Sequence, residues 1–109
     1  MTEFIVIFVT AGSPEEAQRL ARYLVENRLA ACVNRISRVQ SIYRWEGKIE
    51  TSDEELLIIK THKNLFPEVE RSVRENHSYS VPEIVALPLI AGSVPYLEWL
   101  GGQVSVGKT

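Results

Sequence analysis

The chain has 109 residues, of which 45% are hydrophobic and 24% are charged, and its formal net charge is −2. This balance is typical of one globular domain, which we expect to span residues 1–109, and it excludes an extended disordered chain. The small net charge provides no electrostatic footprint for a nucleic-acid backbone or an anionic membrane, so we expect neither as a partner.

The lack of a recognisable export signal and the single cysteine both favour the cytoplasm. No apolar run approaches the roughly 20 residues needed to span a bilayer, and the N-terminus lacks the basic-then-apolar pattern of an export signal. The single cysteine, Cys32, cannot form an internal disulfide. We therefore expect a cytoplasmic protein.

The first predicted elements are a strand and a helix. Residues 3–10 predict a buried strand, because FIVIFV (4–9) is apolar at consecutive positions. The segment SPEE (13–16) is a capping box with proline at the first helical position, so a helix is expected to begin there. Its apolar residues recur at helical spacing and should pack on a sheet: Ala17, Leu20, Ala21, Leu24 and Val25.

A long β-hairpin is predicted next. Residues 31–45 and 49–62 read as its two strands, joined by a tight turn at Glu46-Gly47. Apolar residues spaced by three, at Val33, Ile36 and Val39, predict a bulge near residues 37–38. An arm of about 14 residues spans about 45 Å, which exceeds the roughly 35 Å diameter of a domain this long. The hairpin tip must therefore protrude.

The remaining elements complete an α+β pattern. Asn64 is expected to cap a helix over residues 65–75, and a polar loop leads to a strand over residues 83–90. A short C-terminal helix should open at Ser93 and close at Gly101-Gly102. The order strand, helix, strand, strand, helix, strand predicts a ferredoxin-like βαββαβ antiparallel sheet with both helices on one face.

Three predicted strands are apolar on both faces: FIVIFV (4–9), LLII (56–59) and IVALPLI (84–90). Side chains alternate between the faces of a strand, so both faces of the sheet must be covered. The two helices cover only one face. We therefore expect an obligate assembly of identical chains, with Tyr43, Trp45 and Ile49 of the hairpin tip packed on a neighbour.

Cys32 and His77 are the candidates for metal chemistry. Cys32 is either a small buried hydrophobe or a soft metal ligand. His77, close in sequence to Tyr79 and Glu83, is either a solvent-facing residue at a helix end or a metal ligand and proton carrier. No CxxC motif or paired Cys/His spacing occurs, so no metal is expected to be needed for folding.

Lys60 and Trp45 are the remaining candidates. Lys60 ends the apolar run of its strand, so its ammonium either reaches water or anchors an anionic ligand. Trp45 is interpreted first as an interface residue. The sequence has no Ser-His-Asp trio, Walker loop or G-x-G-x-x-G motif, so an enzyme is not favoured.

Four segments carry a family resemblance: LAACV (29–33), SIYRWEGKI (41–49), IKT (59–61) and HSYSVPEI (77–84). Through them the chain resembles the CutA family of divalent-cation tolerance proteins. The resemblance implies a ferredoxin-like subunit in a cytoplasmic homotrimer with an architecture similar to PII signalling proteins. It also implies a role in tolerance of copper and other divalent metals, with Cys32 matching the recurrent cysteine of the family.

Three hypotheses of function follow. The first is a trimeric metal-response protein that binds a divalent cation of the copper class, or a small anionic ligand, in clefts between subunits. Its ligand-binding residues would be Trp45, Lys60, Tyr79 and Glu83, and its metal ligands Cys32, His77 and Glu83. The second is a trimeric scaffold for a partner protein that binds no small ligand. The third is an acylphosphatase-like enzyme, which would need an anion-binding loop at TAGSP (10–14).

Overall fold

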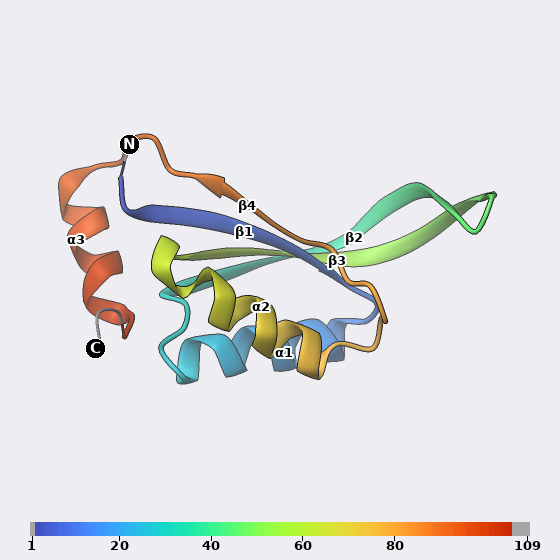
Figure 1. Cartoon of the computed structure of the whole chain (residues 1–109), viewed down its shortest axis with the longest axis horizontal. Coiled ribbons are helices and arrows are strands. Elements are labelled where there is room, and N and C mark those ends of the chain that lie inside the picture. Colours follow the sequence, from blue (N-terminus) through green and yellow to red (C-terminus); the bar gives the residue numbers. More distant parts are fainter. Residues whose placement is uncertain (1, 106–109) are drawn as a thin grey trace.

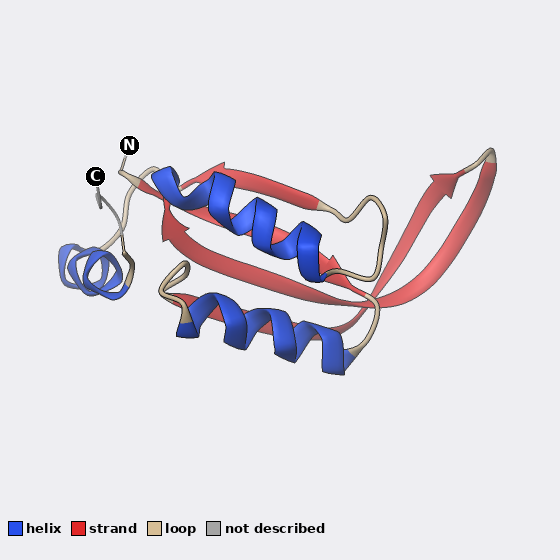
Figure 2. Ribbon diagram, turned by 60° about the horizontal axis from the view of Figure 1, so that its bottom comes forward, coloured by secondary structure: helices blue, strands red, loops and turns tan. Residues whose placement is uncertain are grey.

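A computed structural model describes residues 2–105 as one four-stranded sheet with helices on one face (Figure 1). The strands are β1 (Phe4–Ala11), β2 (Cys32–Trp45), β3 (Lys48–His62) and β4 (Ile84–Pro88), and every pairing is antiparallel in the order β2-β3-β1-β4. Helices α1 (Pro14–Glu26) and α2 (Phe66–Asn76) cover the same face, and α3 (Val94–Gln103) lies at one end (Figure 2). The predicted α+β order is confirmed.

Alternate residues of β1 and β3 build the core beneath the helices. Ile7, Val9, Leu57 and Ile59 are fully buried. They pack against the apolar stripes of α1 and α2, which consist of Ala17, Leu20, Leu24, Val69 and Val73. The start of α1 is as predicted, because the Ser13 hydroxyl accepts the Glu16 N–H at 3.1 Å.

The opposite face of the sheet, called here the open face, carries the other alternate residues. Its apolar members are Val6, Phe8, Ile36, Leu56, Ile58, Val85 and Leu87, which the strand registers place on one side. Ile36, Val85 and Leu87 are exposed. No helix lies over the middle of this face in residues 2–105 (Figure 2). The predicted mismatch between two apolar faces and one helical layer is therefore present in the structure.

The β2-β3 hairpin extends well beyond the sheet (Figure 1). The molecule measures 44 × 25 × 22 Å, and the hairpin accounts for its long axis. Strand pairing shifts register between Ile36 and Val39, where Arg38 has φ of 63°. The predicted bulge is confirmed, and Ile42, Trp45 and Ile49 are exposed along the projecting part.

Two predicted boundaries were wrong. The last strand ends at Pro88 instead of residue 90: the regular ladder with β1 stops there, although the Leu89 N–H still donates to the Phe4 carbonyl at 3.0 Å and the Leu89 carbonyl accepts the Thr2 N–H at 3.1 Å. Asn64 does not cap α2, which has no side-chain cap and follows a 3₁₀ turn, Lys63–Leu65. The cap in this region is His62, whose Nδ1 accepts the Asn64 N–H at 3.0 Å.

The two glycines expected to end α3 lie inside it, because the helix continues to Gln103. At Gly101 an added Cβ would lie 3.2 Å from the Phe4 ring, whereas at Gly102 it would meet nothing within 4 Å. Gly101 therefore permits close packing of α3 on β1. None of the helices within residues 2–105 is long and apolar enough to cross a membrane.

This difference between Gly101 and Gly102 predicts different effects of substitution at the two positions. Gly102→Ala should raise the free energy of unfolding by about 0.5–1 kcal/mol, because alanine favours the helix and contacts nothing. Gly101→Ala should not raise the free energy of unfolding in this way, because its methyl group would displace the Phe4 ring. Chemical denaturation at fixed protein concentration measures both, and equal effects would contradict the packing assigned to Gly101.

Candidate functional site

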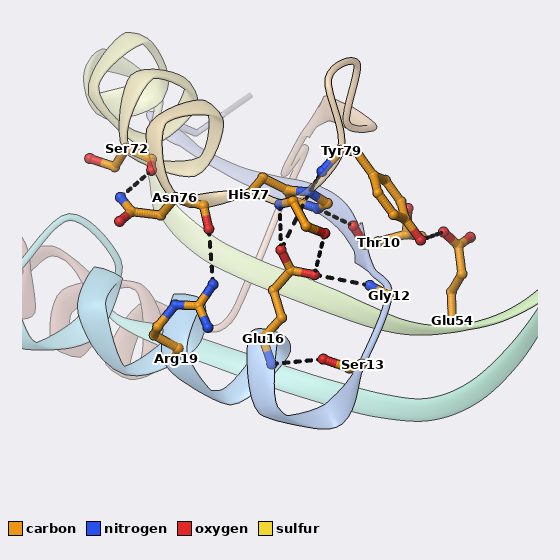
Figure 3. Close-up of polar contacts among 11 residues, drawn as sticks. Thr10, Gly12, Ser13, Glu16, Arg19, Glu54, Ser72, Asn76, His77 and Tyr79 are labelled. Carbon is orange, nitrogen blue, oxygen red and sulfur yellow. Dashed lines mark hydrogen bonds and ion pairs between the residues drawn. The ribbon is translucent and has the colours of Figure 1, made fainter.

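The loop after α2 is fastened to the turn between β1 and α1 by the buried carboxylate of Glu16 (Figure 3). This carboxylate accepts the Ser78 N–H at 2.6 Å, the Ser78 hydroxyl at 3.1 Å and the Gly12 N–H at 3.2 Å. Burial raises the pKa of Glu16, but the hydrogen bonds from Ser78 and Gly12 outweigh it and hold the pKa below its usual value. Glu16 is therefore an ionised anchor for the loop.

The imidazole of His77 is fully buried beside Glu16. Its Nδ1 accepts the Tyr79 N–H at 3.0 Å, and its Nε2 lies 2.7 Å from the Thr10 carbonyl oxygen. These partners assign the proton to Nε2, which donates to Thr10. Both ring nitrogens are engaged, so binding of a metal by His77 would require one of these hydrogen bonds to break.

A groove of about 610 Å³ lies at the base of the hairpin, beside this loop. This hairpin-base groove is lined by Thr10, Ser41, Ile42, Tyr43, Trp45, Glu54, Tyr79, Ser80, Val81 and Glu83. The Tyr79 hydroxyl donates to the Glu54 carboxylate at 2.9 Å (Figure 3). Burial and the Glu54 carboxylate raise the pKa of Tyr79 to about 12, so its phenol remains a neutral donor at physiological pH.

The structure divides the predicted site residues between two places. Trp45, Tyr79 and Glu83 line the hairpin-base groove together. Cys32 and Lys60 are direct cross-strand partners, and their row of the open face continues through Val6 of β1. Thr10 of the groove lies four residues further along β1, about 13 Å away at the rise of a strand.

On the open face, the Lys60 side chain lies near an aromatic ring and the Cys32 thiol lies near a side-chain amide. The Lys60 ammonium lies 5.8 Å from the centroid of the Tyr96 ring of α3. The Cys32 thiol lies 3.8 Å from the Asn34 side-chain oxygen. Within residues 2–105, no group of three or more His, Cys, Asp or Glu residues is arranged to hold a metal ion.

Glu54 and Glu16 were not predicted as site residues. Glu54 belongs to the polar run TSDEE (51–55), and the only signal was its position two residues before the apolar segment LLII (56–59). Glu16 was assigned to a capping box, which accounts for its contact with the adjacent turn. Its bonds to Ser78 span 62 residues and could not be read from local spacing.

Comparison with known proteins identifies the family. A family profile described as "CutA1 divalent ion tolerance protein" matches residues 5–103. The chain belongs to the CutA1 family. The resemblance seen in the sequence is thus confirmed.

Individual relatives agree with this assignment. The Divalent-cation tolerance protein CutA of Thermus thermophilus is 47% identical over 95 residues, which are 87% of this chain and 92% of the relative. The crystal structure of CutA1 from Oryza sativa matches with a TM-score of 0.93 and 44% identity, and the match covers 95% of each chain. These names refer to divalent-cation tolerance or to CutA, and none describes an enzymatic reaction.

The plant relatives are longer proteins. Protein CutA, chloroplastic, of Arabidopsis thaliana is 48% identical over 96 residues, which are 88% of this chain and 53% of the relative. The chain therefore spans about half the length of the plant relatives that it matches.

The Glu16 anchor predicts a specific pH dependence. Because its pKa is lowered on folding, its contribution is fully present above the unfolded value of 4.5 and is lost as the pH falls through the folded value. Glu16→Gln should reduce the free energy of unfolding by about 1–3 kcal/mol at neutral pH. The difference from wild type should shrink at acidic pH.

The matched control is Glu26→Gln, which removes an exposed ion pair with Arg22 on the same helix. Its effect should be within about 1 kcal/mol at every pH. Denaturation curves from neutral to acidic pH test both variants. A Glu16→Gln deficit that stays constant across this range would contradict the ionised anchor.

Proposed function

We propose that this CutA1-family chain forms a homotrimer that responds to divalent cations without catalysing a reaction. The family description and the names of its relatives support a role in divalent-cation tolerance. The strand order β2-β3-β1-β4, with α1 and α2 on one face, supports the ferredoxin-like, PII-like subunit that the resemblance implies. The cytoplasm fits this role, because Cys32 would stay reduced there.

The open face is the observation that carries the proposed assembly. Its apolar residues come from all four strands, and Ile36, Val85 and Leu87 are exposed in the isolated chain. Contiguous apolar patches of this kind mark surfaces that bind other proteins. Covering the open face with identical copies would bury this surface without any other component.

The hairpin supports contact between copies. Its projecting part exposes Ile42, Trp45 and Ile49, and it extends away from the body of the sheet that carries it (Figure 1). An isolated two-stranded ribbon is marginally stable in water, and exposed apolar strands promote aggregation. Packing the ribbon on a neighbouring copy would remove both problems.

The proposed metal site uses Cys32 from more than one copy. Cys32 lies on the open face, so an assembly that covers this face brings equivalent thiols toward shared interfaces. Thiolate ligands favour Cu(I), the form that divalent copper takes after reduction in the reducing cytoplasm proposed here, so Cu(I) represents the copper class of cation at this site. Lys60, the cross-strand partner of Cys32, is the proposed anchor for a small anion at the same interface.

A charged substitution on the open face tests the assembly. Leu87→Glu, at a residue that is 52% exposed in one chain, should convert the trimer to monomers at micromolar concentration. The trimer should dissociate because each carboxylate that is buried without a partner costs several kcal/mol. Val25→Glu, at a residue that is 42% exposed on α1, should leave the trimer intact. Sedimentation equilibrium distinguishes the two, and a trimeric Leu87→Glu protein would contradict the proposed interface.

Removal of the thiol tests the metal site. Cys32→Ser should weaken Cu(I) binding by at least about tenfold, which corresponds to about 1.4 kcal/mol. His77→Asn should leave the affinity unchanged in a folded trimer, because both His77 nitrogens already have partners. Competition titration against a Cu(I) chelator measures both variants. Unchanged affinity in Cys32→Ser would refute the proposed ligand.

A further inference from the structure

We propose that His77 is a proton-dependent switch for the loop after α2. In the neutral ring, Nδ1 accepts the Tyr79 N–H. In the protonated ring, Nδ1 would donate to Glu16 instead, and the Tyr79 N–H would lose its acceptor. The switch lies within one chain, so it goes beyond the proposed function and does not depend on the assembly.

The groups that make up the switch are buried by their own chain. The His77 side chain is 0% exposed and the Glu16 side chain is 7% exposed, and Thr10 is also buried. They lie where the end of β1, the start of α1 and the loop meet (Figure 3). A neighbouring copy that covers the open face therefore leaves the contacts of the His77 ring as they are.

Protonation of Nδ1 makes the present arrangement unfavourable. The neutral ring accepts the Tyr79 N–H at 3.0 Å and donates from Nε2 to the Thr10 carbonyl oxygen at 2.7 Å. An imidazolium ring has two N–H donors and no acceptor. Two donors, the Nδ1–H and the Tyr79 N–H, would then face each other, so the hydrogen bond to Tyr79 must break.

Glu16 offers the new acceptor. Its Oε2 lies 3.7 Å from Nδ1 of His77, so a movement of about 1 Å would give a charge-assisted hydrogen bond. The Glu16 carboxylate now accepts three hydrogen bonds, two from Ser78 and one from Gly12. An ionised carboxylate has about four acceptor positions. Glu16 can therefore receive the Nδ1–H without giving up the loop.

Glu16 is also ionised in the range where histidine changes charge. The hydrogen bonds from Ser78 and Gly12 hold the pKa of Glu16 below 4.5, whereas histidine side chains gain a proton between about pH 8 and pH 5. The carboxylate is therefore negative when the imidazole becomes positive, and the attraction between them favours the switched arrangement.

The other charged and titratable groups near His77 already have partners or are exposed. Arg19 donates to the Asn76 carbonyl oxygen at 3.1 Å, and Glu54 accepts the Tyr79 hydroxyl at 2.9 Å. β1 faces the ring with the Thr10 carbonyl oxygen. The complete set is Glu16 and Arg19 of α1, Glu54 and Glu55 of β3, Arg74 and Glu75 of α2, and Tyr79 of the loop. Of these, Glu16 is the carboxylate within 4.0 Å of a ring nitrogen.

The switch acts at the base of the hairpin, because Tyr79 joins the loop to β3 through its hydroxyl and Glu54. Loss of the bond to the Tyr79 N–H loosens the backbone that carries this side chain. Protonation should therefore weaken the attachment of the loop to the hairpin, while the core beneath α1 and α2 stays folded.

Nitrogen-15 NMR and hydrogen exchange of the wild-type protein test the switch. Between about pH 8 and pH 5, Nδ1 of His77 should gain a proton while Nε2 stays protonated. The protection factor of the Tyr79 amide should fall at least about tenfold over the same range, and the hydrogen-bonded amides of the β1-β3 ladder should keep theirs. A ring that stays neutral down to about pH 5, or unchanged Tyr79 protection once the ring is protonated, would overturn the proposal.

Two histidine variants assign the response to one ring. His77→Asn keeps an acceptor near the Tyr79 N–H but does not titrate, so the protection of this amide should no longer depend on pH. His62→Asn is the matched control, because His62 Nδ1 also accepts a backbone N–H, that of Asn64 at 3.0 Å. The control should respond as wild type does. A response that persists in His77→Asn, or disappears in His62→Asn, would refute the assignment.

Glu16→Gln tests the receiving group. Without the negative charge the imidazolium is less favoured, so His77 should need a lower pH to gain its proton than in wild type. An unchanged titration of His77 in this variant would contradict the role of Glu16. The wild-type measurements need no substitution, so they decide the proposal even where a variant fails to fold.

Discussion

The central constraint on this protein is a sheet that is apolar on both faces but has helices on only one. The core beneath α1 and α2 uses half of the side chains of β1 and β3. The other half form the open face, together with residues of β2 and β4. Water is a poor partner for this second surface, since burial of apolar area is the main force that stabilises proteins. This constraint motivates the proposed assembly of copies, and the family resemblance supplies the proposed number of three.

The candidate site residues occupy two separate regions of the same sheet. Cys32 and Lys60 share a row on the open face, where a neighbouring copy would contact them. The hairpin-base groove lies further along the sheet and contains aromatic rings and carboxylates. The Glu16–His77 cluster fastens the loop that contributes Tyr79 to this groove. Its buried hydrogen bonds therefore position one wall of the groove, and they give both nitrogens of His77 a structural partner.

The order of the elements could be predicted from the sequence because local patterns determine it. The helix N-cap at Ser13, the turn at Glu46-Gly47 and the bulge before Val39 depend on spacing within a few residues, and the structure confirms them. The failed boundaries depend on tertiary contacts. Gly101 could not be recognised as a packing residue without knowing that Phe4 lies against α3.

The candidate site was less predictable for the same reason. Trp45, Tyr79 and Glu83 were selected individually, and the structure gathers them in one groove. Lys60 was grouped with them because the sequence could not show that it lies on another part of the sheet. Glu54 looked like one member of a solvated polar run, but it is buried, and its carboxylate accepts a hydrogen bond from the hydroxyl of Tyr79, 25 residues away.

Native mass spectrometry of the wild-type protein at low micromolar concentration determines whether copies of the chain cover the open face. The proposed trimer requires one dominant species with three times the 12.3 kDa mass of the chain. A dominant species of 12.3 kDa, with a stable fold and no tendency to associate, would contradict it. The open face would then be stable in water, and the argument for an interface between copies would fail.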